Sequence, residues 1–185
     1  MNFVIFDDEK WNNFFPITLT RSTGDLRVGI LKLRQRISSY LDVSETNIIV
    51  SSYLESIYKE RHKDWKVNEI KAEETIFINS RIKIDASSKK AIMSLLVDEC
   101  LVSDDTILAV KCTPKKQNIT SENLNDLFSN LKKKNNAKIT CWNFIWELIS
   151  ENAEYIKRDF NDVFYEKDNY FETELGTTVI NPYNV

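Results

Sequence analysis

Charged side chains with a spacing suited to anion binding are concentrated in residues 15–33, FPITLTRSTGDLRVGILKL. Arg21 and Arg27 carry planar guanidinium groups, and such a group can hold two oxygens of one phosphate. Asp25 lies between them, where it could orient Arg27 or accept a hydrogen bond from a sugar hydroxyl. The same spacing also fits a plainer interpretation, in which Asp25 caps a helix and both arginines are surface or ion-paired residues.

Two further acidic residues, Asp7 and Asp8, come directly after an apolar run at the start of the chain. Carboxylates bind divalent cations, but neighbouring residues of a strand point to opposite sides, so only one of the two is expected to face a site. The only histidine, His62, lies in the polar stretch KERHKDW and is expected at the surface. The three cysteines are odd in number and lack CxxC spacing, which predicts neither a disulfide framework nor a zinc site.

The elements that must position these side chains alternate between strands and helices. Asn2 to Phe6 is typical of a buried strand that opens into a loop, and apolar residues from Val28 to Leu41 have helical spacing. A helix beginning near Arg27 would add its backbone N–H groups to the arginine pair. Further strands are predicted at 47–50, 75–84 and 106–112, with helices at 54–61 and 89–97.

The C-terminal part of the chain is predicted to be helical. Ser121 to Lys134 is typical of a polar, capped helix that ends in lysines, and Ile145 to Phe160 of one long amphipathic helix. Alternating strands and helices predict an α/β fold, a mostly parallel sheet with helices on both faces. Ligands of such sheets bind beyond the carboxyl ends of the strands. Because the sequence shows neither a repeat nor a linker, a single domain over residues 1–185 is predicted.

The composition disfavours several classes of protein. A net charge of −3 and a pI near 5.4 oppose a general nucleic-acid role, which needs clustered Lys and Arg. The sequence contains no apolar stretch long enough to span a membrane, and the start MNFVIFDDEK lacks the features of a signal peptide. We therefore expect a cytoplasmic protein without nucleic-acid or membrane partners.

Three blocks of the sequence resemble the sugar nucleotidyltransferase family that is related to the N-terminal half of bifunctional N-acetylglucosamine-1-phosphate uridyltransferase/acetyltransferases. They are FDD with the later FPITLTRSTGDLRVGILKLRQRI, INSRI at Ile78 to Ile82, and IWELISENAEYIKRDF at Ile145 to Phe160. The resemblance implies a Rossmann-like nucleotidyltransferase domain. It also implies that a sugar 1-phosphate attacks the α-phosphate of a nucleoside triphosphate and releases pyrophosphate, with Mg²⁺ as cofactor.

The resemblance further implies roles for particular residues and a second domain. Arg21 and Arg27 would be catalytic. The residues that would bind substrate are Asp7, Asp25, Asn79 and Arg81. We expect the guanidinium groups of the first crossover and of the third strand to converge on one anion-binding hollow. A left-handed β-helix domain after the apolar ending GTTVINPYNV would allow a homo-oligomer.

The sequence also departs from active relatives. Residues 7–20 contain no glycine where those enzymes carry a Gly-rich loop that approaches the phosphates. Arg81 falls where they place a metal-binding Asp, and an arginine cannot ligate Mg²⁺, although it could neutralise a phosphate. Ser22 and Thr23 stand where a lysine is expected. The alternative hypothesis is therefore a catalytically degenerate module that binds a nucleotide or sugar nucleotide or acts as a scaffold.

Overall fold

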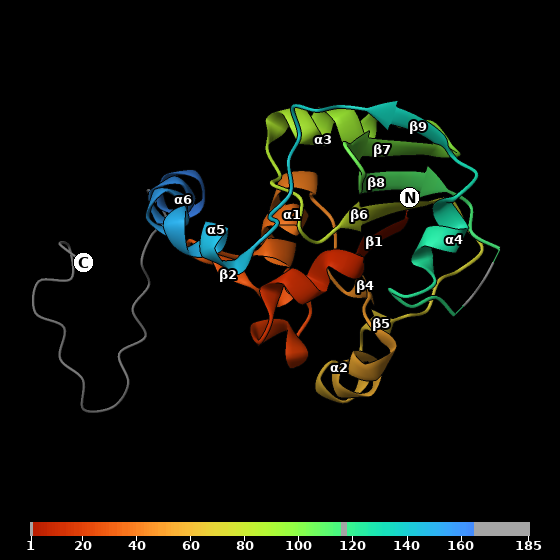
Figure 1. The fold of residues 1–185 in the computed structure, drawn as a ribbon, viewed down its shortest axis with the longest axis horizontal. Helices are drawn as coiled ribbons and strands as arrows, with labels where there is room; N and C mark the ends of the chain where they lie inside the picture. Colours follow the sequence, from red (N-terminus) through yellow and green to blue (C-terminus); the bar gives the residue numbers. More distant parts are fainter. Residues whose placement is uncertain (1, 116–117, 165–185) are drawn as a thin grey trace, which may run out of the picture.

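A seven-stranded sheet forms the centre of the computed structural model, which describes residues 2–115 and 118–164. The strand order is β5-β4-β1-β6-β8-β7-β9, and Figure 1 shows the strands from β9 at the top to β5 at the bottom. Four neighbouring pairs are parallel, whereas β8 runs antiparallel to both β6 and β7. The predicted α/β class with a mostly parallel sheet is confirmed. The strands are β1 (Asn2–Phe6), β4 (Asn47–Ile49), β5 (Lys66–Val67), β6 (Thr75–Asn79), β7 (Glu99–Ser103), β8 (Thr106–Cys112) and β9 (Lys132–Asn135).

Helices cover both faces of this sheet, as predicted. The strands are apolar on both sides, so successive residues of β1 enter different cores. Ile5 packs in the cluster that contains residues of α1 and α3, whereas Val4 and Phe6 pack in the cluster beneath α4. Helix α2 packs on β4 and β5 through a smaller cluster. The helices are α1 (Leu33–Leu41), α2 (Glu55–Arg61), α3 (Ala86–Met93) and α4 (Leu124–Phe128).

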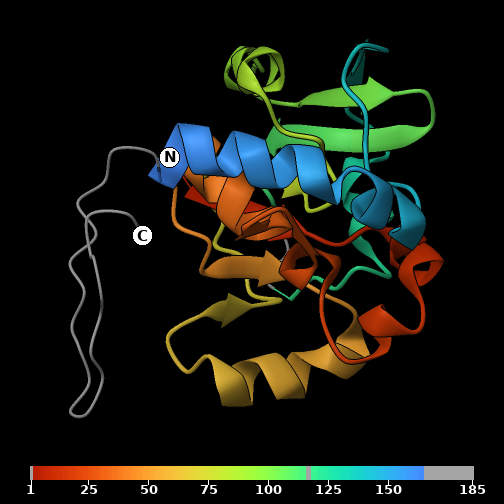
Figure 2. The same cartoon turned by 90° about the vertical axis from the view of Figure 1, so that its left-hand side faces the viewer.

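The predicted long C-terminal helix is two helices, α5 (Ile145–Ser150) and α6 (Asn152–Asp159), separated at Glu151. Figure 2 shows this pair lying in front of α1. The crossover segment, residues 7–32, connects β1 to α1. It shares one buried cluster with Leu33 of α1, Leu148 of α5 and Tyr155 of α6. The C-terminal helices therefore hold the connection between β1 and α1 in place.

The expectation of a helix from Val28 is wrong. Residues 27–32 form an antiparallel hairpin of β2 (Arg27–Val28) and β3 (Leu31–Lys32), and the helix begins only at Leu33. Gly29 turns the hairpin with a φ of 68°, and a Cβ there would lie 2.8 Å from the Tyr155 carbonyl carbon. Arg27 therefore lies on a strand and not at the N-terminus of the helix that follows.

The lysine run is also different from the prediction. Helix α4 ends at Phe128, and Lys132–Asn135 forms the edge strand β9, which pairs in parallel with β7. The ammonium groups of Lys132 and Lys134 lie 3.5 and 3.0 Å from carboxylate oxygens of Glu99, which is buried at the end of the sheet. These ion pairs favour the extended conformation over a helix end.

Two further expectations concern a domain after the C-terminal end and the absence of membrane spans. The ending GTTVINPYNV, at 176–185, lies outside the residues that the structure describes. Among the described residues, no helix combines the length and apolar character needed to cross a bilayer.

Candidate functional site

Asp7, at the end of β1, is buried and fully engaged by the crossover loop. Its carboxylate accepts hydrogen bonds from the hydroxyls of Ser22 and Ser80, at 3.0 and 2.6 Å, and from the backbone N–H of Thr23 at 3.1 Å. Burial raises the pKa of Asp7 to about 6, although these donors act in the opposite direction. Asp7 is 3% exposed and ties the crossover to β1 and to the end of β6, and its expected contact with a substrate stays a prediction.

The raised pKa of Asp7 predicts a pH dependence of stability. A carboxyl whose pKa is higher in the folded state contributes stability below its unfolded pKa and loses it as the pH rises through the folded value. Between about pH 4 and pH 7, the free energy of unfolding of the wild type should therefore fall by about 2–3 kcal/mol relative to Asp7→Asn. Urea unfolding of both proteins across this range measures the difference, and parallel pH profiles would contradict the prediction.

Asp8 points to the other side of β1 and is held by Arg81 and Asn79. Its two carboxylate oxygens accept from Nε and Nη2 of Arg81, and Asn79 Nδ2 donates to Oδ2 at 2.9 Å. The remaining guanidinium nitrogen of Arg81, Nη1, donates to the carbonyl oxygen of Trp142. Arg81 and Asn79 are both 0% exposed. The ion pair with Asp8 therefore occupies the buried guanidinium of Arg81, and the expected substrate contacts of Arg81 and Asn79 stay predictions.

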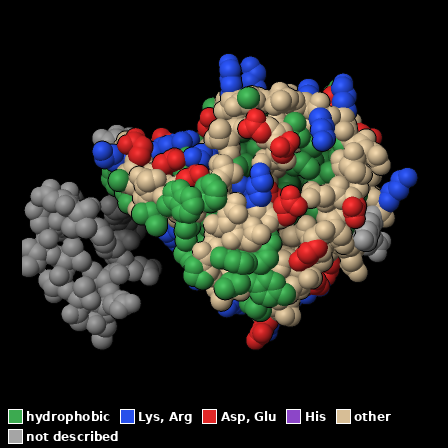
Figure 3. Space-filling view, viewed as in Figure 1, with side chains coloured by type: hydrophobic (Ala, Val, Ile, Leu, Met, Phe, Trp, Pro, Cys, Tyr) green, Lys and Arg blue, Asp and Glu red, His purple; other side chains and the backbone are tan. Residues whose placement is uncertain are grey.

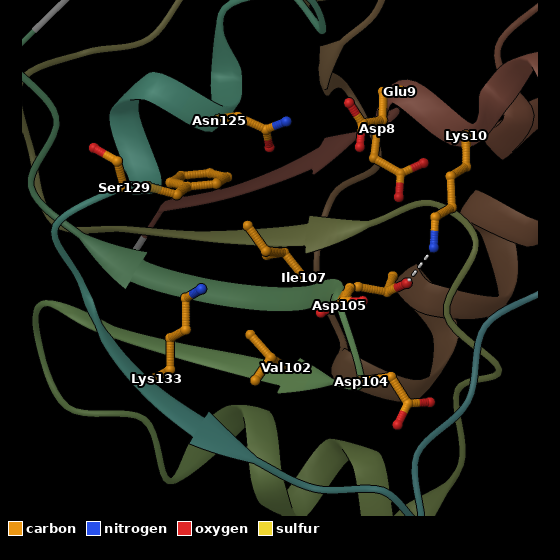
Figure 4. Close-up of a pocket in the computed structure, with 12 residues that line it drawn as sticks. Asp8, Glu9, Lys10, Val102, Asp104, Asp105, Ile107, Asn125, Ser129 and Lys133 are labelled. Carbon is orange, nitrogen blue, oxygen red and sulfur yellow. Dashed lines mark hydrogen bonds between the residues drawn. The ribbon is translucent and has the colours of Figure 1, made fainter.

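Asp8 lines a hollow of about 280 Å³, here called the edge hollow, beyond the carboxyl ends of β1, β6 and β7. Figure 4 shows Asp8, Glu9, Lys10 and Asp105 at one end and Lys133 at the other. Lys10 Nζ donates to Thr106 Oγ1 at 3.0 Å. Of the two aspartates after β1, Asp8 lines this hollow and Asp7 does not. The remaining lining residues are Val102, Asp104, Thr106, Ile107, Asn125, Phe128 and Ser129.

A smaller hollow of about 120 Å³ adjoins the edge hollow, since both are lined by Glu9 and Asn125. Its other lining residues are Trp11, Ser121 and Glu122. The two hollows therefore share part of one wall, and the aromatic side chains of Phe128 and Trp11 belong to their lining.

Arg21, Asp25 and Arg27 line a different hollow, of about 440 Å³, here called the basic hollow. It lies between the crossover and α5, and Lys32 also lines it. Asp25 accepts from Lys32 Nζ at 3.0 Å, from Arg34 Nε at 2.8 Å and from the Tyr58 hydroxyl. Burial alone would raise the pKa of Asp25, but the Tyr58 and Arg34 donors hold it below its ordinary value. Asp25 therefore fixes the positions of the Lys32 and Arg34 side chains.

The predicted site residues are thus divided between two places. Arg21 and Arg27 line the basic hollow, whereas Arg81 is sealed behind Asp8 and lines neither hollow. The edge hollow and the basic hollow share no lining residue. The expectation that the guanidinium groups converge on one anion-binding hollow is wrong. Arg81 is paired with Asp8 inside the protein, whereas Arg21 and Arg27 line the basic hollow.

The described residues do not fit a preformed Mg²⁺ site. Within 2–115 and 118–164, no three His, Cys, Asp or Glu side chains are grouped as metal ligands. Both oxygens of Asp8 already accept from Arg81, and an arginine supplies no oxygen ligand.

Most residues that line the edge hollow were not predicted from the sequence as site residues. Asp104, which has a φ of 49°, and Asp105 form the turn between β7 and β8. Because β7 runs in the same direction as β1, this turn lies at the edge of the sheet where β1 ends. The sequence does carry a signal for this turn, because DD between two apolar runs indicates a hairpin. Lys133 could not be placed by a helical interpretation of the lysine run.

Three comparisons relate the chain to known proteins. A comparison with curated proteins finds no match. Among solved structures, a candidate glucose-1-phosphate thymidylyltransferase from Bacillus anthracis, crystallised with sucrose, is 12% identical with a TM-score of 0.42, covering 90% of this chain and 98% of that one. A likeness of this size assigns neither substrate nor site residues. The model of the sugar nucleotidyl transferase family matches residues 3–167, and the chain therefore belongs to that family.

Proposed function

We propose that the chain transfers a nucleotidyl group from a nucleoside triphosphate to a sugar 1-phosphate in the edge hollow. The observation that carries this proposal is the family match over residues 3–167, which includes every residue of the edge hollow. The position of the hollow also supports it, since ligands of α/β sheets bind beyond the carboxyl ends of the strands.

The lining of the edge hollow suits a phosphorylated sugar. Asp104, Asp105 and Asn125 supply oxygens and an amide that can bind hydroxyl groups. Lys10 and Lys133 supply ammonium groups for phosphate oxygens. In the adjoining hollow, the Trp11 ring offers a surface against which a nucleobase can pack. The two substrates would then meet beside Glu9 and Asn125.

The proposed reaction is a displacement at the α-phosphorus. A phosphate oxygen of the sugar 1-phosphate forms a bond to this phosphorus, the bond to the bridging oxygen breaks, and the electron pair leaves with pyrophosphate. Lys10, held at 3.0 Å from Thr106, neutralises charge on the phosphate oxygens during the displacement. Arg81 and Asn79 are positioning residues, because they orient Asp8 at the wall of the hollow.

Pyrophosphate release tests the proposal. Each nucleoside triphosphate is combined with a panel of sugar 1-phosphates, with and without Mg²⁺, and the products are identified by mass spectrometry. We expect a nucleotide sugar in at least one combination. Pyrophosphate release in none of them would contradict the proposal.

Lys10→Ala tests the role of the Lys10 ammonium group in this reaction. Removal of one ammonium group that neutralises developing charge should lower kcat about 10- to 100-fold, while the thermal unfolding midpoint stays close to that of the wild type. Lys90→Ala, on the exposed side of α3, is the control and should leave kcat unchanged. An equal loss in both variants would remove Lys10 from the reaction.

A second candidate function is a binding module that does not turn over its ligand. The ion pair of Asp8 with the 0% exposed Arg81 favours it, because Arg81 stands where the resemblance puts a metal-binding carboxylate. Calorimetric binding of a nucleotide or sugar nucleotide, together with no pyrophosphate release, would select this function.

A further inference from the structure

Large apolar side chains are exposed together on one face of the molecule. This surface, here called the apolar face, combines residues of the crossover, of α5 with its N-cap, and one residue just before α2. They are Phe15, Ile17, Leu19, Tyr53, Phe144, Trp146 and Ile149, and their exposed fractions range from 38% for Phe144 to 71% for Ile149. Figure 3 shows hydrophobic side chains gathered over α5 and over the crossover on the side that it displays.

The α5 half of the apolar face is ordered by packing between its own side chains. The rings of Phe144 and Trp146 are stacked, and their centroids lie 4.4 Å apart. Trp146 and Ile149 are three residues apart on α5 and therefore lie on the same side of this helix. Ile149 also lines the basic hollow, and Ile17 of the crossover lines the same hollow. The two halves of the face therefore meet there.

The crossover half is held together by aromatic contacts. The ring centroid of Trp11 lies 5.1 Å from that of Phe15 and 5.9 Å from that of Tyr53. The Tyr53 hydroxyl donates to the carbonyl oxygen of Leu19, and Leu19 belongs to the same 3₁₀ turn as Ile17. The apolar face is therefore one ordered surface from Phe15 to α5.

The area of the apolar face suits one side of a dimer interface. A large apolar side chain has about 150–250 Å² of surface, and the members of the face are on average about half exposed, so together they expose roughly 700 Å². The largest apolar patch of a typical monomer covers about 300–600 Å², whereas each partner of a stable complex buries about 800 Å². The apolar face is therefore larger than a monomer needs and sufficient for an interface core.

The face also carries a projecting ring beside a hollow. Trp146 is 59% exposed and does not line the basic hollow, so its indole lies outside the opening, next to Ile149. The hollow, of about 440 Å³, has the size of pockets that hold drug-sized ligands and can therefore hold one indole. Its apolar lining residues are Ile17, Leu26, Ile145, Leu148 and Ile149.

The arginines of the basic hollow favour an aromatic occupant supplied by another copy. Arg21 and Arg27 are exposed, and neither forms an ion pair with any residue in 2–115 or 118–164. A guanidinium group stacks on an indole ring, and arginine and tryptophan are both enriched in protein interfaces. Because the projecting ring and the hollow lie on the same face, a two-fold rotation lets two copies exchange them.

We propose that two copies of this chain form a two-fold symmetric dimer through the apolar face, with Trp146 of each copy in the basic hollow of the other. Both apolar faces are then removed from water, which contributes about 25 cal/mol per Å² of apolar surface. The apolar face shares no residue with the edge hollow, so the dimer does not depend on the proposed reaction.

Sedimentation equilibrium of the whole chain, from micromolar to sub-millimolar concentration, tests the dimer. The mass should rise from 21.7 kDa to twice this value. Trp146→Ala should raise the dimer Kd about 30-fold, because a buried tryptophan carries a large share of the binding energy of an interface. Leu96→Ala, 66% exposed between α3 and β7, is the matched control and should leave the Kd unchanged. Both variants should unfold at the temperature of the wild type.

Labelling of an introduced thiol identifies what covers the apolar face. The three native cysteines are buried, so Ile149→Cys supplies a thiol that reacts readily with a maleimide when the face is open. Its reaction should be about tenfold slower above the dimer Kd than below it, whereas Leu96→Cys should react at one rate throughout.

A mass of one chain at every concentration would overturn the proposal. Slow labelling of Ile149→Cys at every concentration would then assign the face to a cover within the same chain, and fast labelling would show that nothing covers it. A failure of the pyrophosphate assay leaves these results unchanged.

Discussion

Replacing Arg81 by methionine should lower the free energy of unfolding by about 3–5 kcal/mol, because removal of one partner from a largely buried ion pair leaves an uncompensated charge. Arg81 is 0% exposed, and its guanidinium donates to both oxygens of Asp8 and to the carbonyl oxygen of Trp142. The variant keeps the aliphatic volume but removes the donors of these acceptors, and the Asp8 carboxylate keeps only the hydrogen bond from Asn79 among the described residues. Urea denaturation at neutral pH measures the loss.

The reason for the Arg81 effect can be tested with a second substitution. In the double variant Arg81→Met with Asp8→Leu, no charge is left unpaired, so much of the lost stability should return. The exposed Arg61→Met is the control and should change stability by less than about 0.5 kcal/mol. A double variant as unstable as Arg81→Met alone would show that the loss comes from packing instead of from the orphaned carboxylate.

Asp159→Ala should lower the free energy of unfolding by about 3–4 kcal/mol, since its carboxylate joins three parts of the fold. It accepts from the guanidinium of Arg36 in α1 and from the backbone N–H groups of Ile30 and Leu31, at 2.8 and 3.3 Å. Asp159 is 1% exposed, so its loss removes the carboxylate acceptor from two backbone N–H groups and from the buried Arg36 guanidinium, which keeps only the Val28 carbonyl oxygen among the described residues. Urea denaturation measures this loss, and hydrogen exchange should show faster opening of α5 and α6.

The pH dependence of the Asp159 contribution can be derived from its pKa. Burial would raise this pKa, but the Arg36 guanidinium and the Ile30 N–H hold it below the ordinary value. The stabilisation is therefore present above the unfolded pKa of the carboxyl and is lost as the pH falls through the folded value. Asp162→Ala is the control, because its 58% exposed carboxylate lies 3.7 Å from Arg158 and should contribute little. Equal losses in both variants would contradict a special role for Asp159.

The parts of the fold that could be predicted are those where local pattern and tertiary packing agree. The buried strands Asn2–Phe6 and Thr106–Cys112 appear with the predicted bounds, because their apolar runs are flanked by charged turns. The hairpin at 27–32 could not be predicted from its apolar spacing, which suits a helix equally well. Its conformation depends on Gly29 passing close to Tyr155, a contact between residues far apart in sequence.

The candidate site was predictable in its location but not in its details. The carboxyl ends of β1 and β6 do carry the polar side chains that the sequence indicated. Whether such side chains face outward depends on partners from other segments, and these were not evident. Asp7 is hydrogen-bonded to Ser22 and Ser80, and Arg81 to Asp8. These charged groups therefore stabilise the fold by contacts within the protein.

The lysines of β9 have a consequence for the behaviour of the molecule in concentrated solution. An open sheet edge can recruit a strand from another molecule, which is a route to aggregation. Here the edge strand carries Lys132, Lys133 and Lys134 in succession, and all three are exposed. A second copy that approached with the same strand would bring six ammonium groups together. Like-charge repulsion therefore protects this edge from intermolecular strand pairing.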